Sequence, residues 1–254
     1  MPKVLAASTV HELAHEFIDE DAKGDVAFWL YATTAYCALR IGTELVFPGK
    51  HRGYTYQQYV VTLLHQALLL PLLCLGWAVG LWSREGSSLI YLLTGAYMVS
   101  DSIVNYSPVS GCVCSPSTGP PHFSWAVHTH HFYTFVLCAL GTTLPPWMED
   151  EGAIAILLGE FGSLWITITL LYPTGLNFIL RFYVFLGTRI LGLAIATDIA
   201  RQLAAESLVV TCTFVILVCG VVYGNWVTLG RMRQNARKAV EKEPPGTPTK
   251  SWPL

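Results

Sequence analysis

The sequence predicts an all-α membrane protein, a bundle or barrel of about seven transmembrane helices. Its 254 residues are 53% hydrophobic and only 13% charged, against about 25% charged residues in a typical soluble domain. Most charges gather near the two ends of the chain and in the predicted connections. Between them lie apolar runs of ~20 residues, the length that a helix needs to cross a ~30 Å hydrocarbon core.

Residues 1–25 form an acidic segment, which we expect to be an amphipathic helix lying against the membrane surface. Thr9-Val-His-Glu12 has the pattern of a capping box, apolar residues follow at helical spacing, and Gly24 is the expected end. The segment also contains His11-Glu12-Leu13-Ala14-His15, which matches the zinc-protease pattern H-E-x-x-H. A zinc site needs a third ligand and a closed cleft, and the surrounding sequence predicts neither.

The first span and its loop occupy residues 26–56, and the main transmembrane domain occupies residues 57–231. The predicted spans are 26–47, 59–82, 88–107, 123–144, 153–172, 178–198 and 207–229. An odd number of spans places the two ends of the chain on opposite sides of the membrane. Residues 232–254 are expected to form a disordered basic tail, with a Pro-, Lys- and Glu-rich part from Glu241 onward.

The charges in the connections predict the orientation. The connections on the C-terminal side carry the basic residues Lys50, Arg52, Arg181, Arg231, Arg233, Arg237 and Lys238. The other side carries Glu149, Asp150, Glu151 and the acidic N-terminal segment. By the positive-inside rule, the C-terminal end is predicted to be cytoplasmic.

The stretch Trp125–Thr134, WAVHTHHFYT, introduces three histidines into an apolar helical run. His128 and His131 lie three residues apart on one helix face, whereas His130 is rotated by about 100° from its neighbour. A charged group at membrane depth costs roughly 2.5 kcal/mol or more to insert, so it usually faces a cavity or a partner. This helix is therefore the first candidate for a functional site.

Other predicted spans contribute ionisable side chains of their own, namely His65, Asp101 and Glu160. If these groups meet the histidines, they form one polar pocket inside an apolar bundle. Two interpretations concern the charges nearby. Arg189 offers Glu160 a matching positive charge, with Asp198 as a competitor. Arg40 and Glu44 stand four residues apart on the first span and are expected to neutralise each other.

The polar residues follow a fixed order, with one element in each span. The series is His65, then Tyr97-x-x-x-Asp101, His130-His131, Glu160-x-x-Ser163 and Arg189-Ile190. In this order the chain resembles the TLC-domain family of membrane proteins, over roughly residues 57 to 231. That family includes the ceramide synthases and smaller branches assigned to lipid homeostasis. The resemblance implies helices around a lipid- or acyl-accommodating cavity, in the endoplasmic reticulum or another endomembrane.

The resemblance favours a small TLC-domain-containing branch over the ceramide synthases proper. Ceramide synthases carry an H-D-x-x-D segment in the span after the histidine pair, whereas this sequence reads EFGSLWITITLLYPTGLNF there. They also have a long loop before the last span, and the segment from Asp198 to Ser207 is short. The Glu160-x-x-Ser163 arrangement is similar to the small branch.

Two functions follow from the resemblance. In the enzymatic one, acyl-CoA is the donor and His130 or His131 attacks the thioester or takes a proton from the acceptor, while Asp101 orients the imidazole. In the alternative, the same groups hydrogen-bond across helices around a bound lipid, at ~0.6–2 kcal/mol for each contact. Substrate-binding roles are assigned to His65, Tyr97, His128, Glu160, Ser163 and Arg189.

Other membrane-protein classes fit less well. A retinal-binding receptor needs a lysine in the last span, and residues 207–229 contain none. A di-iron desaturase needs several histidine boxes, and only one cluster exists here. A transporter predicts inverted repeats, which the sequence lacks. We expect membrane lipids as partners, without metal, cofactor or nucleic acid, and the sequence predicts no oligomeric state and no role for Cys112 and Cys114.

Overall fold

The structure is a computed structural model that describes residues 20–79, 85–106 and 125–241. In these residues the only strands form a small antiparallel hairpin, β1 (Lys50–His51) and β2 (Tyr54–Thr55). The first three helical rods are α2 (Glu20–Val46), the continuous rod α3 (Tyr56–Leu63), η1 (Leu64–Leu69) and α4 (Leu70–Ala78), and α5 (Glu85–Tyr106). The others are α7 (Trp125–Gly141), α8 (Pro146–Leu171), α9 (Gly175–Glu206) and α10 (Leu208–Glu241).

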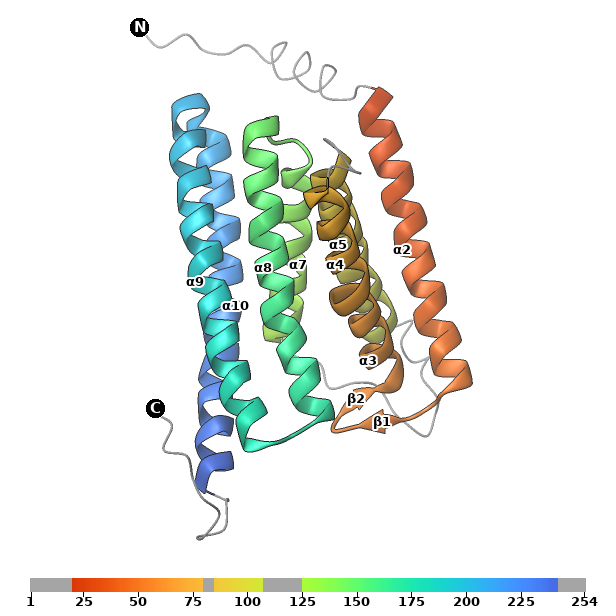
Figure 1. Ribbon diagram of the computed structural model, residues 1–254. Helices are drawn as coiled ribbons and strands as arrows, with labels where there is room; N and C mark the ends of the chain where they lie inside the picture. The colour runs from red at the N-terminus through yellow and green to blue at the C-terminus, as the bar shows by residue number, and fades with distance from the viewer. Residues whose placement is uncertain (1–19, 80–84, 107–124, 242–254) are drawn as a thin grey trace, which may run out of the picture.

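Successive rods run in opposite directions, so α2 begins at the upper end of the bundle and α10 ends at the lower end (Figure 1). The packing follows a closed series: α2 contacts α5, followed by α7, α10, α9, α8 and α3, which returns to α2. Seen in Figure 1, the series forms two facing layers with α2 at one edge. The predicted all-α class is confirmed.

Five of the described helices are long and apolar enough to cross a membrane. They cover Tyr56–Ala78, Gly86–Asn105, Trp147–Leu171, Gly175–Glu206 and Leu208–Lys238. The rods α2 and α7 are not among them, and α7 has only 17 described residues. The chain therefore has the helices of a multi-pass membrane protein, and seven spans remain a prediction.

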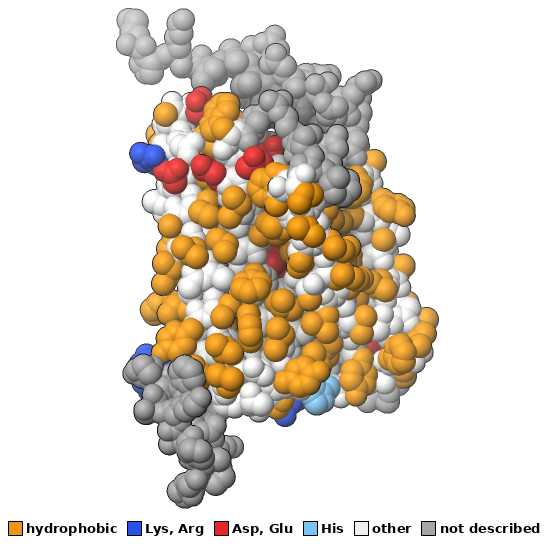
Figure 2. Space-filling model, in the orientation of Figure 1, with side chains coloured by type: hydrophobic (Ala, Val, Ile, Leu, Met, Phe, Trp, Pro, Cys, Tyr) orange, Lys and Arg blue, Asp and Glu red, His pale blue; other side chains and the backbone are white. Residues whose placement is uncertain are grey.

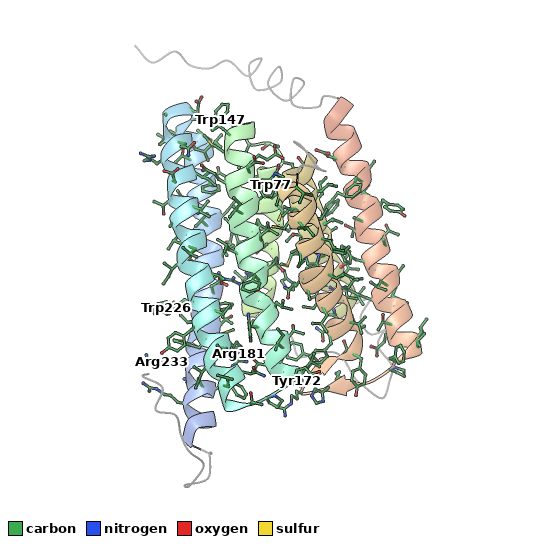
Figure 3. The ribbon with its side chains drawn as sticks, in the orientation of Figure 1. Trp77, Trp147, Tyr172, Arg181, Trp226 and Arg233 are labelled. Carbon is green, nitrogen blue, oxygen red and sulfur yellow. The ribbon has the colours of Figure 1, made fainter. Side chains whose placement is uncertain are left out.

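The surface has the pattern that a bilayer requires. Hydrophobic side chains cover the middle of the face in Figure 2, while acidic side chains gather near the upper end. Figure 3 shows Trp77 and Trp147 toward the upper end, and Tyr172 and Trp226 toward the lower end. Indole and phenol rings favour the membrane interface. Trp226 is 74% exposed, so it suits contact with lipid rather than with the core.

Two boundary predictions are wrong. The helix α2 begins at Glu20 and continues through Gly24, which was expected to end a separate helix. One glycine costs a helix only about 1 kcal/mol, too little to stop it here. At the other end, α10 continues to Glu241, so residues 232–241 are helical rather than disordered. Met232 and Ala236 are buried four residues apart, which extends the packed face of the helix.

Several sequence predictions fall on residues that the structure does not describe. They concern residues 1–19 with His11 and His15, the loop 107–124 with Cys112 and Cys114, and residues 242–254. The structure therefore does not test these predictions.

The second rod changes its helical type at the level of its polar residues. Leu64–Leu69 form a π-helix, and Pro71 follows directly in the first turn of α4. A proline ring clashes with the carbonyl four residues earlier and lacks an N–H group, so a wider turn before it relieves both problems. The wide turn holds His65 and Gln66, two adjacent polar residues that are both buried.

Close helix packing depends on Gly141, which faces the ring of Tyr91. A Cβ atom at this position would overlap the ring, and the Tyr91 hydroxyl is fixed by donating to the Glu149 carbonyl at 2.8 Å. We expect Gly141→Ala to destabilise the protein by about 1–3 kcal/mol through overpacking. The matched control is Gly42→Ala, where the Cβ meets open space. Melting curves in detergent should move down for the first variant and not for the second; equal curves would contradict the packing.

Candidate functional site

The central charge pair joins α2 to α5. Arg40 Nη1 lies 2.7 Å from Asp101 Oδ1, and the Arg40 side chain is 0% exposed. The guanidinium also donates to Ser100 Oγ at 3.2 Å and to Gln57 Oε1 at 3.3 Å. Asn105 Nδ2 donates to the same Asp101 oxygen at 2.9 Å. The buried carboxylate thus has a cation and an amide as partners, as a charge at this depth requires.

The predicted Arg40–Glu44 pair is wrong. Arg40 reaches across to Asp101, and both carboxylate oxygens of Glu44 are buried without a hydrogen-bond partner among the described residues. The competing role predicted for Asp198 is also wrong, because Asp198 Oδ1 pairs with Arg201 Nη2 at 2.8 Å. In the first case a partner on another helix outweighs the local spacing. In the second case an exposed neighbour three residues away is nearer than Arg189.

The two adjacent histidines of α7 have different surroundings. His131 Nδ1 lies 3.5 Å from Asp101 Oδ2, longer than an ordinary hydrogen bond. His130 Nδ1 lies 3.5 Å from the Thr134 hydroxyl one turn further along the helix. The ring centroids are 5.9 Å apart. Because of the helical rotation, His131 rather than His130 contacts Asp101 in the described residues.

His65 belongs to the packed interior rather than to the wall of a pocket. Its Nδ1 lies 2.7 Å from the Tyr36 hydroxyl, and its ring stacks on Tyr97 with 4.4 Å between centroids. The guanidinium of Arg40 also lies over the Tyr97 ring, with Cζ 5.1 Å from the ring centroid. Tyr97 itself shares a hydrogen bond of 2.8 Å with Thr62. The substrate-binding role predicted for His65 therefore has no geometric support, whereas Tyr97 lines the chamber described below.

Glu160 and Ser163 on α8 bind different neighbours. Gln66 Nε2, in the π-helical turn, donates to Glu160 Oε2 at 2.6 Å. Arg189 Nη2 on α9 donates to Ser163 Oγ at 2.8 Å, and Nη1 donates to the Gly159 carbonyl. The predicted Arg189–Glu160 attraction does not take the form of a close ion pair in the described structure, because the guanidinium is turned to Ser163 and the backbone.

These residues surround a cavity of about 340 Å³, which we call the polar chamber. Its inner wall contains Asp101, His130, His131, Glu160, Ser163 and Arg189. Its lower end contains Tyr54, Arg181 and Arg231. The predicted convergence of side chains from separate helices into one hollow is thus present for all of these inner-wall residues. His128 lies in the first turn of α7, and its side chain is outside the described part.

A second cavity of about 370 Å³, the apolar cavity, adjoins the chamber. The two share His130, Glu160, Phe185, Arg189 and Asn225. The rest of its lining is almost entirely aliphatic and comes from α7, α8, α9 and α10, including Ala155, Leu193 and Val221. Ile190, Leu193 and Trp226 line it and are also exposed on the outer surface. The apolar cavity therefore borders the side of the bundle that would face lipid.

Sequence reasoning missed one wall of the chamber. Gln58, Thr62 and Gln66 on the second rod all line it. They stand four residues apart, which puts them on one helix face, and this polar stripe was the available signal. Arg40 was missed as the partner of Asp101, since no local pattern connects two helices. In the described residues, no group of three or more His, Cys, Asp and Glu is arranged to hold a metal.

Fold and site together define a bundle of membrane-type helices in which a polar chamber adjoins an apolar cavity. Comparisons with protein-family models, with curated proteins and with solved structures found no match to this chain. Membership of the TLC-domain family therefore stays a prediction that rests on the order of the sequence motifs.

Proposed function

We propose that this chain is a TLC-like protein of lipid homeostasis, which holds an acyl chain in the apolar cavity and presents the polar end of that molecule to His131 and Asp101. The observation that supports it is the junction of the two cavities at His130, Glu160 and Arg189. An amphipathic ligand needs an aliphatic compartment beside a polar one. The combined volume lies in the usual range for small-molecule sites, ~300–1,000 Å³.

The proposed reaction is acyl transfer from an acyl-CoA to a lipid acceptor. Neutral His131 takes the proton of an acceptor N–H or O–H group as the acceptor adds to the thioester carbonyl carbon. The C–S bond then breaks, and the proton passes from the imidazolium to the leaving thiolate, which gives an amide or ester and free CoA. Asp101 stabilises the imidazolium in between. The 3.5 Å separation is compatible with this role, because such contacts often shorten only when substrate is bound.

A second candidate is a non-catalytic lipid-binding protein that regulates membrane composition. It is favoured by the pairing of Asp101 Oδ1, which already accepts from Arg40 and Asn105. A carboxylate that is already paired with a cation stabilises a neighbouring imidazolium less. In this candidate the same pocket binds the lipid without turnover.

The proposal includes an orientation and a membrane. The lower end of the bundle carries Arg181, Arg231 and the hairpin residues Lys50 and Arg52, while Glu149 to Glu151 lie at the other end of α8. By the positive-inside rule this supports a cytoplasmic lower end. The chamber would then open where acyl-CoA is found. Residence in the endoplasmic reticulum or another endomembrane follows from the family resemblance alone.

A variant that fills the apolar cavity tests the proposal. Val221→Trp adds an indole to a wall of the cavity, so we expect bound acyl lipid to fall at least about tenfold, or to shift to shorter chains. The control is Val215→Trp, on the exposed face of the same helix and outside the cavity lining. Native mass spectrometry of the full chain measures the bound lipid. Equal occupancy in Val221→Trp and wild type would exclude this cavity as the acyl site.

A further inference from the structure

Arg181 is a buried cation that has no counter-ion among the described residues. The residue is 4% exposed, and both Nε and Nη2 are buried without a hydrogen-bond partner in the part of the chain that the structure describes. Within the described ranges no acidic side chain forms an ion pair with it. The ring of Phe178 offers a cation–π contact, with its centroid 5.0 Å from Arg181 Cζ. A buried donor that lacks a partner costs free energy, so a residue of this kind is expected to serve a ligand.

The guanidinium faces space that a ligand can occupy. Arg181 lines the lower end of the polar chamber together with Tyr54, Arg231 and Asn235. Arg231 comes from α10 and is exposed, so it adds a second positive charge from another helix. Figure 3 shows Arg181 in the lower part of the bundle, toward the same end as Tyr172 and Arg233. That end is also the one at which the aromatic residues suggest a membrane interface.

We propose that Arg181 and Arg231 bind a phosphate group at the lower end of the polar chamber. Two cations from facing helices favour a multiply charged anion over a single carboxylate. The planar guanidinium of Arg181 matches two phosphate oxygens at once, and its orphaned Nε and Nη2 are the pair that such binding uses. The phosphate belongs either to the headgroup of an anionic lipid or to a soluble molecule such as CoA. The phosphate site itself is argued from Arg181 and Arg231, whereas the acyl chain of the ligand rests on the proposed function.

The test compares ligands that differ only in the phosphate. The purified full-length chain is incubated with dioleoyl phosphatidic acid, with dioleoylglycerol, with CoA and with inorganic phosphate. Bound lipid is measured by native mass spectrometry, and the melting temperature is recorded with each probe. Wild type is expected to prefer phosphatidic acid to dioleoylglycerol at least about tenfold, since a charge-assisted bidentate contact is lost in the second lipid.

Three variants make the result specific. Arg181→Met should remove the preference and raise the melting temperature of the ligand-free protein, because it deletes an unpaired buried charge. Arg181→Lys should keep part of the preference, since a lysine retains the charge without the fork. Arg233→Gln removes a positive charge from the same end outside the chamber, so it should keep the preference in full.

The outcomes separate the two proposals. A preference that survives Arg181→Met, or a ligand-free melting temperature that falls in this variant, overturns the phosphate site. Equal binding of the two lipids, with no stabilisation by CoA or inorganic phosphate, also overturns it and leaves the acyl site intact. Binding of neither lipid, with stabilisation by CoA or phosphate that Arg181→Met removes, supports the phosphate site and contradicts the acyl site. Stabilisation by CoA or inorganic phosphate comparable to that by phosphatidic acid identifies a soluble phosphate as the ligand.

Discussion

Replacing Arg40 by methionine is expected to lower the stability of the fold by about 3–5 kcal/mol. The change leaves Asp101 as a buried carboxylate that keeps its contacts with Asn105 and, at 3.5 Å, with His131. It also leaves Gln57 and Ser100 without the donor that they accept from. The full chain should therefore melt at a lower temperature in detergent and accumulate to a lower level in membranes.

Arg201→Met is the matched control, because it breaks an ion pair of nearly the same length. The Arg201 side chain is 79% exposed, so this variant should lose at most about 1 kcal/mol. In the double variant Arg40→Met with Asp101→Leu, both charges are absent, and stability should recover toward wild type. Similar melting temperatures for Arg40→Met and Arg201→Met would show that the buried pair does not hold α2 on α5.

The second large effect is expected at His131. If acyl transfer occurs, His131→Ala should reduce the yield of acylated lipid by about 10²–10⁴, the usual contribution of a general acid–base group. Abundance should stay near wild type, since Asp101 retains Arg40. The measurement is lipid analysis of cells that carry each variant, normalised to the amount of folded protein.

His65→Ala provides the contrast for this experiment. The His65 ring packs between Tyr36 and Tyr97 in the core. Its removal leaves a cavity, which should lower the free energy of unfolding by roughly 2–5 kcal/mol, as for other large-to-small core changes. The abundance of the folded protein should fall as a result. The activity of each remaining folded molecule should change much less. An unchanged lipid product in His131→Ala, at normal abundance, would contradict acyl transfer and favour the non-catalytic candidate.

The long apolar runs made the helices predictable, because a run of this length indicates a membrane helix whatever helices pack against it. The neighbourhood of Asp101 and His131 was also predictable, since few groups at membrane depth can satisfy each other. Arg40 was not, because its spacing from Glu44 satisfied a local rule that a contact between helices overrode. Gln66 and Arg181 needed coordinates: one is positioned by a wide turn before Pro71, and the other is distinguished only by the partners it lacks.

The border of the apolar cavity at Ile190, Leu193 and Trp226 has a consequence for traffic through the protein. Under the proposed function, a lipid product would leave the apolar cavity laterally, toward the bilayer. A water-soluble leaving group would leave the polar chamber past Arg231, toward the aqueous phase. The two products would thus leave by separate routes. When product release is slow, the slower of these two steps would set the turnover rate.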